Sequence, residues 1–317
     1  MRTLTLQFIL AATLLLALLA ACAPAAPAAT PTPTPEPTPE PITLTDGLDR
    51  TITLAGPAQR IVSLAPSNTE ILYAIGAGAQ VVGRDEFSNY PDAAASLPTV
   101  GGSFGGYNNE AIVALKPDLV LAAEINTPEQ VQALEDLGLM VFYLANPTTL
   151  DGMYANLVTV ASLTGQDGNA KTLVASLMAR VAVVEKQAVL VTERPTVFYE
   201  LDSTDPNAPY TAGPGTFIDT LINMAGGVNV AAGMGAAWGQ LSVEELVVQD
   251  PAIILLGDAA YGVTVESVGQ RAGWEGLQAV KTSRVYPFND DLVSRPGPRL
   301  VDALEALYGL LHPDASK

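Results

Sequence analysis

Two segments decide the fold: Glu110-Ala-Ile-Val-Ala-Leu-Lys-Pro117-Asp-Leu-Val-Leu121 and Glu244-Glu-Leu-Val-Val-Gln-Asp-Pro251-Ala-Ile-Ile-Leu255. They align without a gap at an offset of 134 residues. In each copy a glutamate stands in the first turn of an expected helix, a proline seven positions later ends that helix, and an apolar strand follows. The repeat predicts two similar α/β lobes instead of one long sheet.

Around both segments, short β-rich runs alternate with helical periodicity, as is typical of βα units on a mostly parallel sheet. The expected strands are Ile61–Leu64, Val81–Gly83, Leu119–Ala122, Met140–Leu144, Thr196–Leu201, Ala252–Leu256 and Arg284–Phe288. The expected helices are Thr69–Ile75 capped by Ser67 or Asn68, a helix from Thr127 to Gly138, Thr216–Ala225, Ser242–Val248, Val268–Val280 and Pro298–Leu311. The pattern predicts an α/β fold with two Rossmann-like lobes.

One long rigid helix is expected to join the lobes, because residues 169–190 are rich in Ala, Leu and Val. At about 1.5 Å per residue, this helix would be roughly 33 Å long. We expect an N-terminal lobe at residues 43–148, a connecting helical backbone at 149–191 and a C-terminal lobe at 192–317. A ligand cleft would lie between the lobes, and the helix would limit how far they swing.

The first residues have the features of a lipoprotein signal peptide. Arg2 precedes an apolar run of 14 residues, which is too short to cross a bilayer of roughly 30 Å. Leu19-Ala20-Ala21-Cys22 resembles a bacterial lipobox, so residues 1–21 are expected to be removed and the thiol of Cys22 to be lipidated. Residues 22–42 then form a Pro/Thr-rich linker. These features predict an extracytoplasmic protein, anchored to a membrane by its lipid, in a periplasm or on the outer face of a cell membrane.

Charge and residue counts exclude several classes of protein. Against 15 Lys and Arg stand 33 Asp and Glu, and the resulting formal charge of −18 repels nucleic acid. One Cys and one His leave no multi-cysteine or multi-histidine metal site, so we expect neither a bound metal nor a cofactor of the protein's own. The chain also lacks a GxxxxGK[ST] phosphate-binding motif. We expect a binding protein and not an enzyme.

Three groups of residues carry a family resemblance: Arg60-Ile-Val-Ser-Leu-Ala-Pro-Ser-Asn-Thr-Glu70, then Val82-Gly83 with Tyr90-Pro91, then Glu110 with Leu115-Lys-Pro-Asp-Leu-Val120. They resemble the helical-backbone solute-binding proteins of bacterial ABC importers, most closely the members that bind vitamin B12. The resemblance implies two α/β lobes, a ligand between them, and a permease dimer with its ATPase as partner. It also implies that Glu110 and Glu244 dock onto the two permease subunits. From the residues alone, glutamates favoured by the helix dipole explain the pattern equally well.

The same resemblance implies a ligand site in loops at the carboxyl ends of strands, where open α/β sheets bind ligands. The candidate residues are Phe87, Phe104, Tyr107, Tyr210, Trp238, Asp291 and Arg295. All but Tyr107 match ligand-lining positions of cobalamin-binding members, whereas one aromatic of those members falls at Ala123, beside Glu124. For any single aromatic residue, ordinary packing inside a lobe is the alternative.

Among ligands, a corrinoid such as cobalamin is favoured, because it brings its own cobalt and is nearly neutral. Ferric siderophores are commonly anionic and meet clustered cations, but the expected cleft loops have only Arg84, Arg295 and, nearby, Arg299. Haem needs an axial ligand, and His312 lies far from the expected cleft, which leaves Tyr107 or Tyr210. Siderophore and haem binding stay alternatives, and a structural surface lipoprotein is a more remote one. We expect a monomer, because a twofold-symmetric permease itself supplies the twofold axis.

Overall fold

The computed structural model describes residues 40–102 and 106–314 of the chain. The expected signal peptide, Cys22 and nearly all of the linker lie outside these residues, and so does Phe104. Within the described ranges, no helix is both long enough and apolar enough to cross a membrane.

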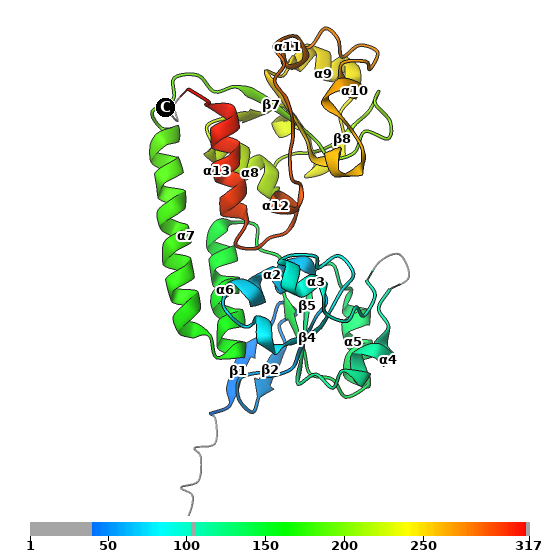
Figure 1. Ribbon diagram of the computed structural model, residues 1–317, viewed down its shortest axis with the longest axis vertical. Helices are drawn as coiled ribbons and strands as arrows, with labels where there is room; N and C mark the ends of the chain where they lie inside the picture. Colours follow the sequence, from blue (N-terminus) through cyan, green and yellow to red (C-terminus); the bar gives the residue numbers. More distant parts are fainter. Residues whose placement is uncertain (1–39, 103–105, 315–317) are drawn as a thin grey trace, which may run out of the picture. The chain divides into compact units, whose positions relative to one another are not determined.

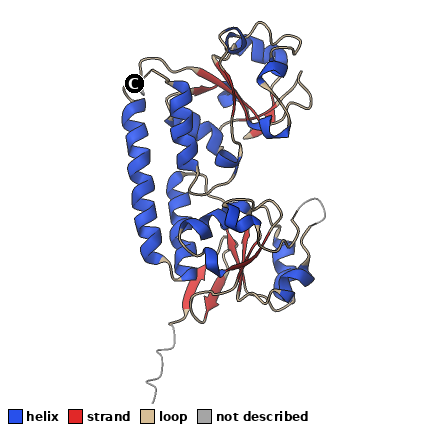
Figure 2. Ribbon diagram, viewed as in Figure 1, coloured by secondary structure: helices blue, strands red, loops and turns tan. Residues whose placement is uncertain are grey.

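Two four-stranded parallel sheets form the centres of two α/β lobes (Figures 1 and 2). The first sheet has the order β4-β3-β5-β6, with β3 at Ile61–Ser63, β4 at Val81–Arg84, β5 at Leu119–Ala123 and β6 at Val141–Leu144. The second has the order β9-β7-β11-β12, with β7 at Thr196–Glu200, β9 at Val228–Asn229, β11 at Ile253–Leu256 and β12 at Val285–Pro287. Both sheets therefore repeat one strand order, which confirms the two lobes. The seven expected strands are all present, and β9 is an addition to them.

The repeated segment has the same local structure in both lobes. α4 (Asn109–Ala114) and α9 (Val243–Gln249) each carry their glutamate in the first turn. In both lobes the residue that precedes the proline has a left-handed backbone conformation, and the helix ends before it. Its φ is 50° at Lys116 and 41° at Asp250. The internal symmetry thus extends from the sequence to the backbone.

Two further strand pairs are antiparallel. β1 (Ile42–Thr45) pairs with β2 (Thr51–Leu54), and both strands precede the first sheet in the sequence. β8 (Tyr210–Ala212) pairs with β10 (Trp238–Gln240), so the prediction of loops at Tyr210 and Trp238 was wrong. The pairing joins segments that are far apart in the chain. The residues of one short strand do not indicate with which other segment it pairs.

The start of α2 (Pro66–Ala74) also differs from the prediction. Neither Ser67 nor Asn68 caps this helix, because it begins ahead of them with a proline at its first position. Asn68 is buried, and its amide donates to the carbonyls of Leu121 and Ala122 at 3.1 and 3.0 Å. The side chain ties α2 to the end of β5.

Residues 268–280 do not form the expected continuous helix. α10 (Val265–Val268) and α11 (Gln278–Lys281) are separate, and Gly273 between them has φ of 88°. The indole of Trp274 is fully buried there and donates to the Pro206 carbonyl at 3.1 Å. Turns that bury this ring replace the helix that the apolar periodicity predicted.

The long helix is α7 (Asp167–Ala188), whose 22 residues confirm the expected connecting helix. α6 (Leu150–Thr164) and α13 (Leu300–Leu311) both pack along it (Figure 1). The helical segment at 149–191 therefore consists of two helices, which Gly165 separates in a left-handed conformation. The other helices are α3 (Asp92–Ala95), α5 (Pro128–Asp136), α8 (Phe217–Met224), α12 (Asp291–Ser294) and the 3-10 turns η1 (Gly78–Gln80), η2 (Val230–Gly233) and η3 (Gly257–Tyr261).

A candidate ligand site between the lobes

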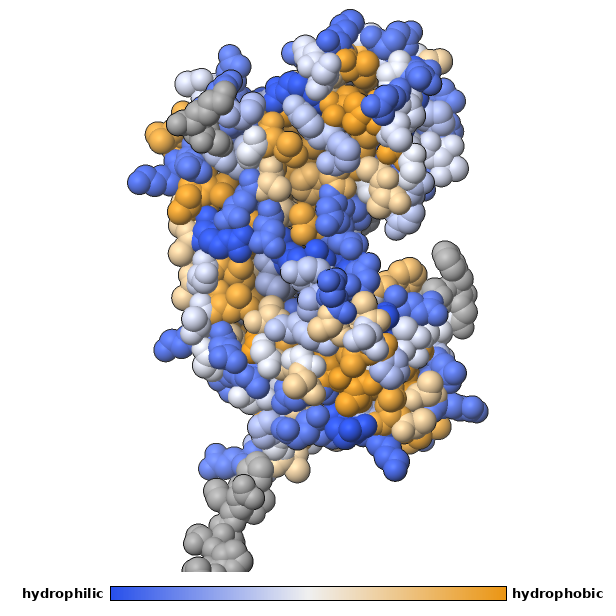
Figure 3. All heavy atoms as spheres, in the orientation of Figure 1, coloured by the Kyte–Doolittle hydropathy of each residue, from blue (hydrophilic) through white to orange (hydrophobic). Residues whose placement is uncertain are grey.

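The carboxyl ends of the strands in each sheet face the other lobe. Arg295, which follows β12 of the second sheet, donates to the Phe87 carbonyl and the Asn89 amide oxygen on the loop after β4 of the first sheet. Figure 3 shows a notch between the lobes, on the side away from α7. The loop after β4 and the segment after β12 therefore meet between the lobes.

On the first lobe, the loop after β4 exposes two aromatic rings. Phe87 is 47% exposed and Tyr90 45%. Asp85 shapes this loop, since its carboxylate accepts the Phe87 N–H at 2.8 Å and the Ser88 hydroxyl. Burial raises the pKa of Asp85, although the hydrogen bonds from Ser88 and Phe87 oppose that rise. The loop is thus internally braced, and both rings remain partly exposed to solvent.

On the second lobe, Tyr210 and Trp238 lie on one face of the β8–β10 pair. In this pair Trp238 stands opposite Ala212 and Tyr210 opposite Gln240, which puts the four side chains on the same side. Tyr210 is 41% exposed and Trp238 48%. A cavity of about 410 Å³ adjoins Tyr210 and is lined by Asp202, Thr204, Asp205, Ala208, Tyr210 and Gln240. The second lobe therefore offers flat apolar surface beside hydrogen-bond acceptors.

Tyr107 has a structural task. Its hydroxyl donates to the Leu64 carbonyl at 2.7 Å and accepts the Asn126 amide at 2.8 Å. Burial raises the pKa of Tyr107 to about 12, against a lowering by the hydrogen bond from Asn126. The hydroxyl ties the loop before α4 to the carboxyl ends of β3 and β5, at the floor of the site.

Arg84 is buried and its guanidinium is occupied by backbone carbonyls. It donates to the carbonyls of Asp85, Glu86, Ala94 and Ala95 at 2.9 to 3.2 Å. Its charge therefore holds the first-lobe loop in place.

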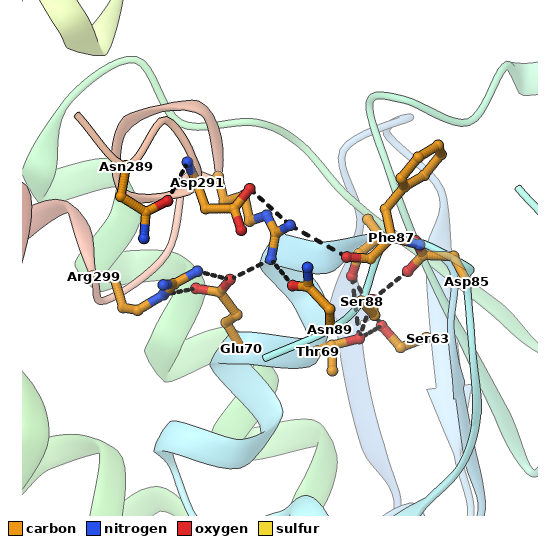
Figure 4. A network of polar contacts seen from close by, with 12 residues as sticks. Ser63, Thr69, Glu70, Asp85, Phe87, Ser88, Asn89, Asn289, Asp291 and Arg299 are labelled. Carbon is orange, nitrogen blue, oxygen red and sulfur yellow. Dashed lines mark hydrogen bonds and ion pairs between the residues drawn. The ribbon is translucent and has the colours of Figure 1, made fainter. Parts of the chain in front are cut away.

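Asp291 lies at the contact between the lobes (Figure 4), and Arg295 lies there too, since it donates to Phe87 and Asn89 of the first lobe. The two side chains form an ion pair at 2.8 Å, and Arg295 also pairs with Glu70 of α2 at 3.1 Å. Arg299 donates through Nε to the same Glu70 at 2.7 Å. Asp291 and Arg295 were predicted as site residues from the sequence, whereas Glu70, the partner of Arg295 and Arg299 on the other lobe, was not.

Two more exposed side chains follow the carboxyl ends of strands, and neither was predicted as a site residue. Ile125 follows β5 and is 61% exposed, and Tyr261 follows β11 and is 89% exposed. β5 and β11 are corresponding strands of the two sheets, so each lobe presents one bulky side chain just beyond the repeated segment. Both residues could have been identified from the sequence repeat, because they follow corresponding strands.

The lone histidine lies away from the cleft. His312 is buried, its Nε2 is 3.0 Å from the Ala225 carbonyl, and it lines a cavity of about 780 Å³ together with Pro195 and Ala252. These two residues precede β7 and β11, so this cavity is at the amino ends of the strands, opposite the aromatic residues. In the described part of the chain, no group of three or more His, Cys, Asp or Glu side chains could hold a metal ion.

The two repeated glutamates, Glu110 of α4 and Glu244 of α9, are both exposed. Glu110 and Glu244 each have an exposed valine one turn further on, Val113 at 40% and Val247 at 47%. Each lobe thus presents one carboxylate beside one apolar side chain.

Comparison with known proteins gives the same architecture. A model of the periplasmic binding protein family matches residues 61–292. An uncharacterized ABC transporter substrate-binding lipoprotein of Bacillus subtilis (strain 168) is 34% identical over 87% of this chain and 87% of its own length. A cobalamin-binding protein of Halobacterium salinarum (strain R1) is 33% identical over 86% of this chain and 74% of its own length.

Among solved structures, the apo form of the periplasmic heme-binding protein RhuT from Roseiflexus sp. RS-1 superposes with a TM-score of 0.73. It is 30% identical and covers 82% of this chain and all of its own. The family resemblance read from the sequence is therefore confirmed. Because the family match spans both sheets and the relatives align over most of the chain, this protein belongs to the periplasmic binding protein family.

Proposed function

We propose that this protein captures a corrinoid such as cobalamin between its lobes and delivers it to the permease of an ABC importer. The observation that carries the proposal is the set of exposed aromatic rings at the carboxyl ends of both sheets, Phe87 and Tyr90 on one lobe and Tyr210 and Trp238 on the other. A corrinoid has broad apolar faces and a fringe of amides, which suit flat rings and scattered hydrogen-bond acceptors. Asp202 and Asp205, in the cavity beside Tyr210, are such acceptors.

The arginines near the cleft support a neutral ligand over an anionic siderophore. Arg84 donates to carbonyls of its own lobe, and Arg295 and Arg299 are paired with Glu70. A siderophore would have to compete with these carboxylate and carbonyl partners for each guanidinium. The similar cobalamin-binding protein of Halobacterium salinarum adds to the case for a corrinoid.

Haem is the second candidate, favoured by the exposure of Tyr210 and by the similarity to a heme-binding protein. A tyrosine can serve as axial ligand to haem iron. Of the two tyrosines considered, Tyr210 suits this role better, because the hydroxyl of Tyr107 already has a donor and an acceptor partner.

The proposal includes the location and the partner. We place the signal peptide at residues 1–21, the lipid on Cys22, the linker at 22–42, and the lobes at 43–148 and 192–317, with the protein outside the cytoplasm as a lipid-anchored monomer. Glu110 and Glu244 would meet the two subunits of the permease, because two carboxylates at corresponding positions of a two-lobed protein fit a twofold-symmetric partner.

Titration of the purified protein with cyanocobalamin, haemin and a ferric hydroxamate siderophore tests the ligand. Tryptophan fluorescence and calorimetry would follow binding in the wild type, in Trp238→Phe and in Trp238→Ala, and both variants keep the buried Trp274 as an internal control. We expect saturable binding of cyanocobalamin, with a loss of about tenfold in affinity for Trp238→Ala. Saturable binding of haemin without cyanocobalamin would transfer the proposal to haem, and the absence of binding by all three would end it.

A further inference from the structure

Glu70 joins the two lobes through buried ion pairs (Figure 4). Its side chain is 1% exposed, and those of Arg295 and Arg299 are 11% and 10% exposed. Arg299 binds the carboxylate through two of its nitrogens, and Arg295 binds it through a third N–H. Asp291 supplies a second carboxylate to Arg295, so two positive charges meet two negative ones. Such a balance is what a buried group of charges requires, because an unpaired buried charge is costly.

The same two arginines hold the aromatic loop of the first lobe. Arg295 donates to the Phe87 carbonyl at 3.2 Å and to the Asn89 amide oxygen at 2.8 Å. The guanidinium carbon of Arg299 lies 4.0 Å from the centre of the Tyr90 ring, a cation–π distance. The loop that presents Phe87 therefore depends on side chains that belong to the other lobe.

Arginine suits this arrangement for a geometric reason. Its planar guanidinium has five N–H donors in fixed directions, so Arg295 reaches Glu70, Asp291, Asn89 and the Phe87 carbonyl together. A lysine would keep the charge but concentrate its donors at one nitrogen, and it could not serve all four acceptors.

We propose that Arg295 and Arg299 are positioning residues, which hold the first-lobe loop at residues 85–90 from the second lobe and so set the direction in which Phe87 meets the ligand. Glu70 keeps both arginines in place. The effect on ligand affinity rests on the proposed function, but the effect on the loop does not. Movement of one lobe against the other would then also move the aromatic ring, so the geometry of the lobes and that of the site change together.

Amide hydrogen exchange of the ligand-free protein, followed by mass spectrometry over residues 85–90, tests the loop. Arg295→Lys retains the charge, and Asn89→Ala removes an exposed acceptor while leaving Arg295 in place. We expect exchange in this segment to rise about tenfold in Arg295→Lys, and less in Asn89→Ala, with the unfolding midpoint little changed. The matched control is Arg284→Lys, because Arg284 donates to the carbonyls of Leu310 and Leu311 at the far end of α13, away from the loop. Wild-type exchange in both loop variants, or an equal rise throughout the chain, overturns the proposal.

Affinity for cyanocobalamin, measured in the same variants, tests the consequence for binding. Weaker binding in Asn89→Ala, whose substitution leaves Arg295 intact, supports positioning over direct contact of Arg295 with the ligand. Unchanged affinity in both variants, despite faster exchange, overturns the role in binding. If the wild type does not bind cyanocobalamin, the corrinoid proposal fails, while faster exchange in the loop variants still supports the positioning role.

Discussion

Glu200 and Arg271 form an ion pair that water barely reaches, with side chains 0% and 10% exposed. Two guanidinium nitrogens contact the carboxylate at 2.5 and 2.9 Å, and one of them also donates to the Ser203 hydroxyl at 2.9 Å. Burial raises the pKa of Glu200, whereas Arg271 lowers it. The arginine therefore offsets the cost of placing a carboxylate at the end of β7.

Replacement of Arg271 by methionine should destabilise the protein by about 3–5 kcal/mol at pH 7, because it leaves the Glu200 carboxylate buried and unpaired. The pKa of Glu200 then rises further above its ordinary value of 4.5, so the folded state binds the proton more tightly than the unfolded state. The lost stability should accordingly return as the pH falls through the raised folded-state pKa of Glu200, and the return should be complete below 4.5. Urea denaturation at several pH values measures this effect, with Arg271→Lys as control. A loss that does not depend on pH would contradict the explanation.

Tyr107→Phe should cost about 1–3 kcal/mol, because it leaves the Leu64 carbonyl and the Asn126 amide without their hydroxyl partner. Urea denaturation gives the change in stability, and Tyr210→Phe is the exposed control, for which we expect little change. Normal stability of Tyr107→Phe together with a loss of haemin binding would instead make Tyr107 a ligand to haem iron.

For single residues, the sequence indicated which side chains to consider for the site, but not the hydrogen-bond and ion-pair partners of those side chains. Phe87, Tyr210 and Trp238 could be selected because they match ligand-lining positions of the family that the sequence resembles. The Glu70–Arg295 pair joins residues 225 positions apart, and a contact between lobes leaves no periodic trace in the sequence. The task of Tyr107 was likewise hidden, since it depends on the carbonyl of a residue in another strand-end loop.

Among the secondary-structure elements, α7 and α13 show how the connecting helix is held. Leu177, Val181 and Val184 of α7 are buried, and Arg180 of the same helix is paired with Asp302 and Glu305 of α13. The hydrogen bond from Arg180 lowers the pKa of Glu305, although burial opposes that effect. Apolar packing and an ion-pair cluster thus act together on one face of the helix.

Glu305→Gln should cost less than about 1 kcal/mol at neutral pH, because the paired side chains are more than a third exposed and solvent screens their attraction. Since the folded-state pKa of Glu305 lies below 4.5, the stabilisation is present above that pH and is lost as the pH falls through the folded-state value. Thermal unfolding of variant and wild type should therefore differ at pH 7 and converge at low pH. Glu275→Gln, on the exposed surface, serves as control, and a difference that persists in strong acid would refute the assignment.

Most elements were predictable where burial is uniform. The strands of both sheets read as short apolar runs because helices or loops cover both faces of a parallel sheet. The predicted secondary structure was wrong in two places. Residues 268–280 form turns that bury Trp274, and β8 and β10 form only because they pair with each other. The local pattern of apolar residues indicates neither the burial of one large ring nor the pairing with a distant segment.

For the whole molecule, the repeat places one glutamate on each lobe at corresponding positions, so the docking proposal concerns both lobes at once. Glu110→Ala/Glu244→Ala should leave the affinity for cyanocobalamin unchanged and reduce its uptake about tenfold or more in cells where this is the only binding protein. The matched control is Glu129→Ala/Glu245→Ala, which removes the same charge from exposed positions on neighbouring parts of the two lobes. Equal uptake by the two double variants would withdraw the docking role.

The shared strand order makes the protein comparable to a homodimer whose subunits have been fused. In a true twofold dimer, every contact between subunits occurs twice, and dilution separates the partners. Here α7 keeps the halves together at any dilution, and each half is free to diverge. The arginines after β12 have no counterpart after β6, where the chain has neither Lys nor Arg between Lys116 and Lys171. The Glu70 contact therefore occurs once, and such an asymmetry would not arise between two identical chains related by a twofold axis.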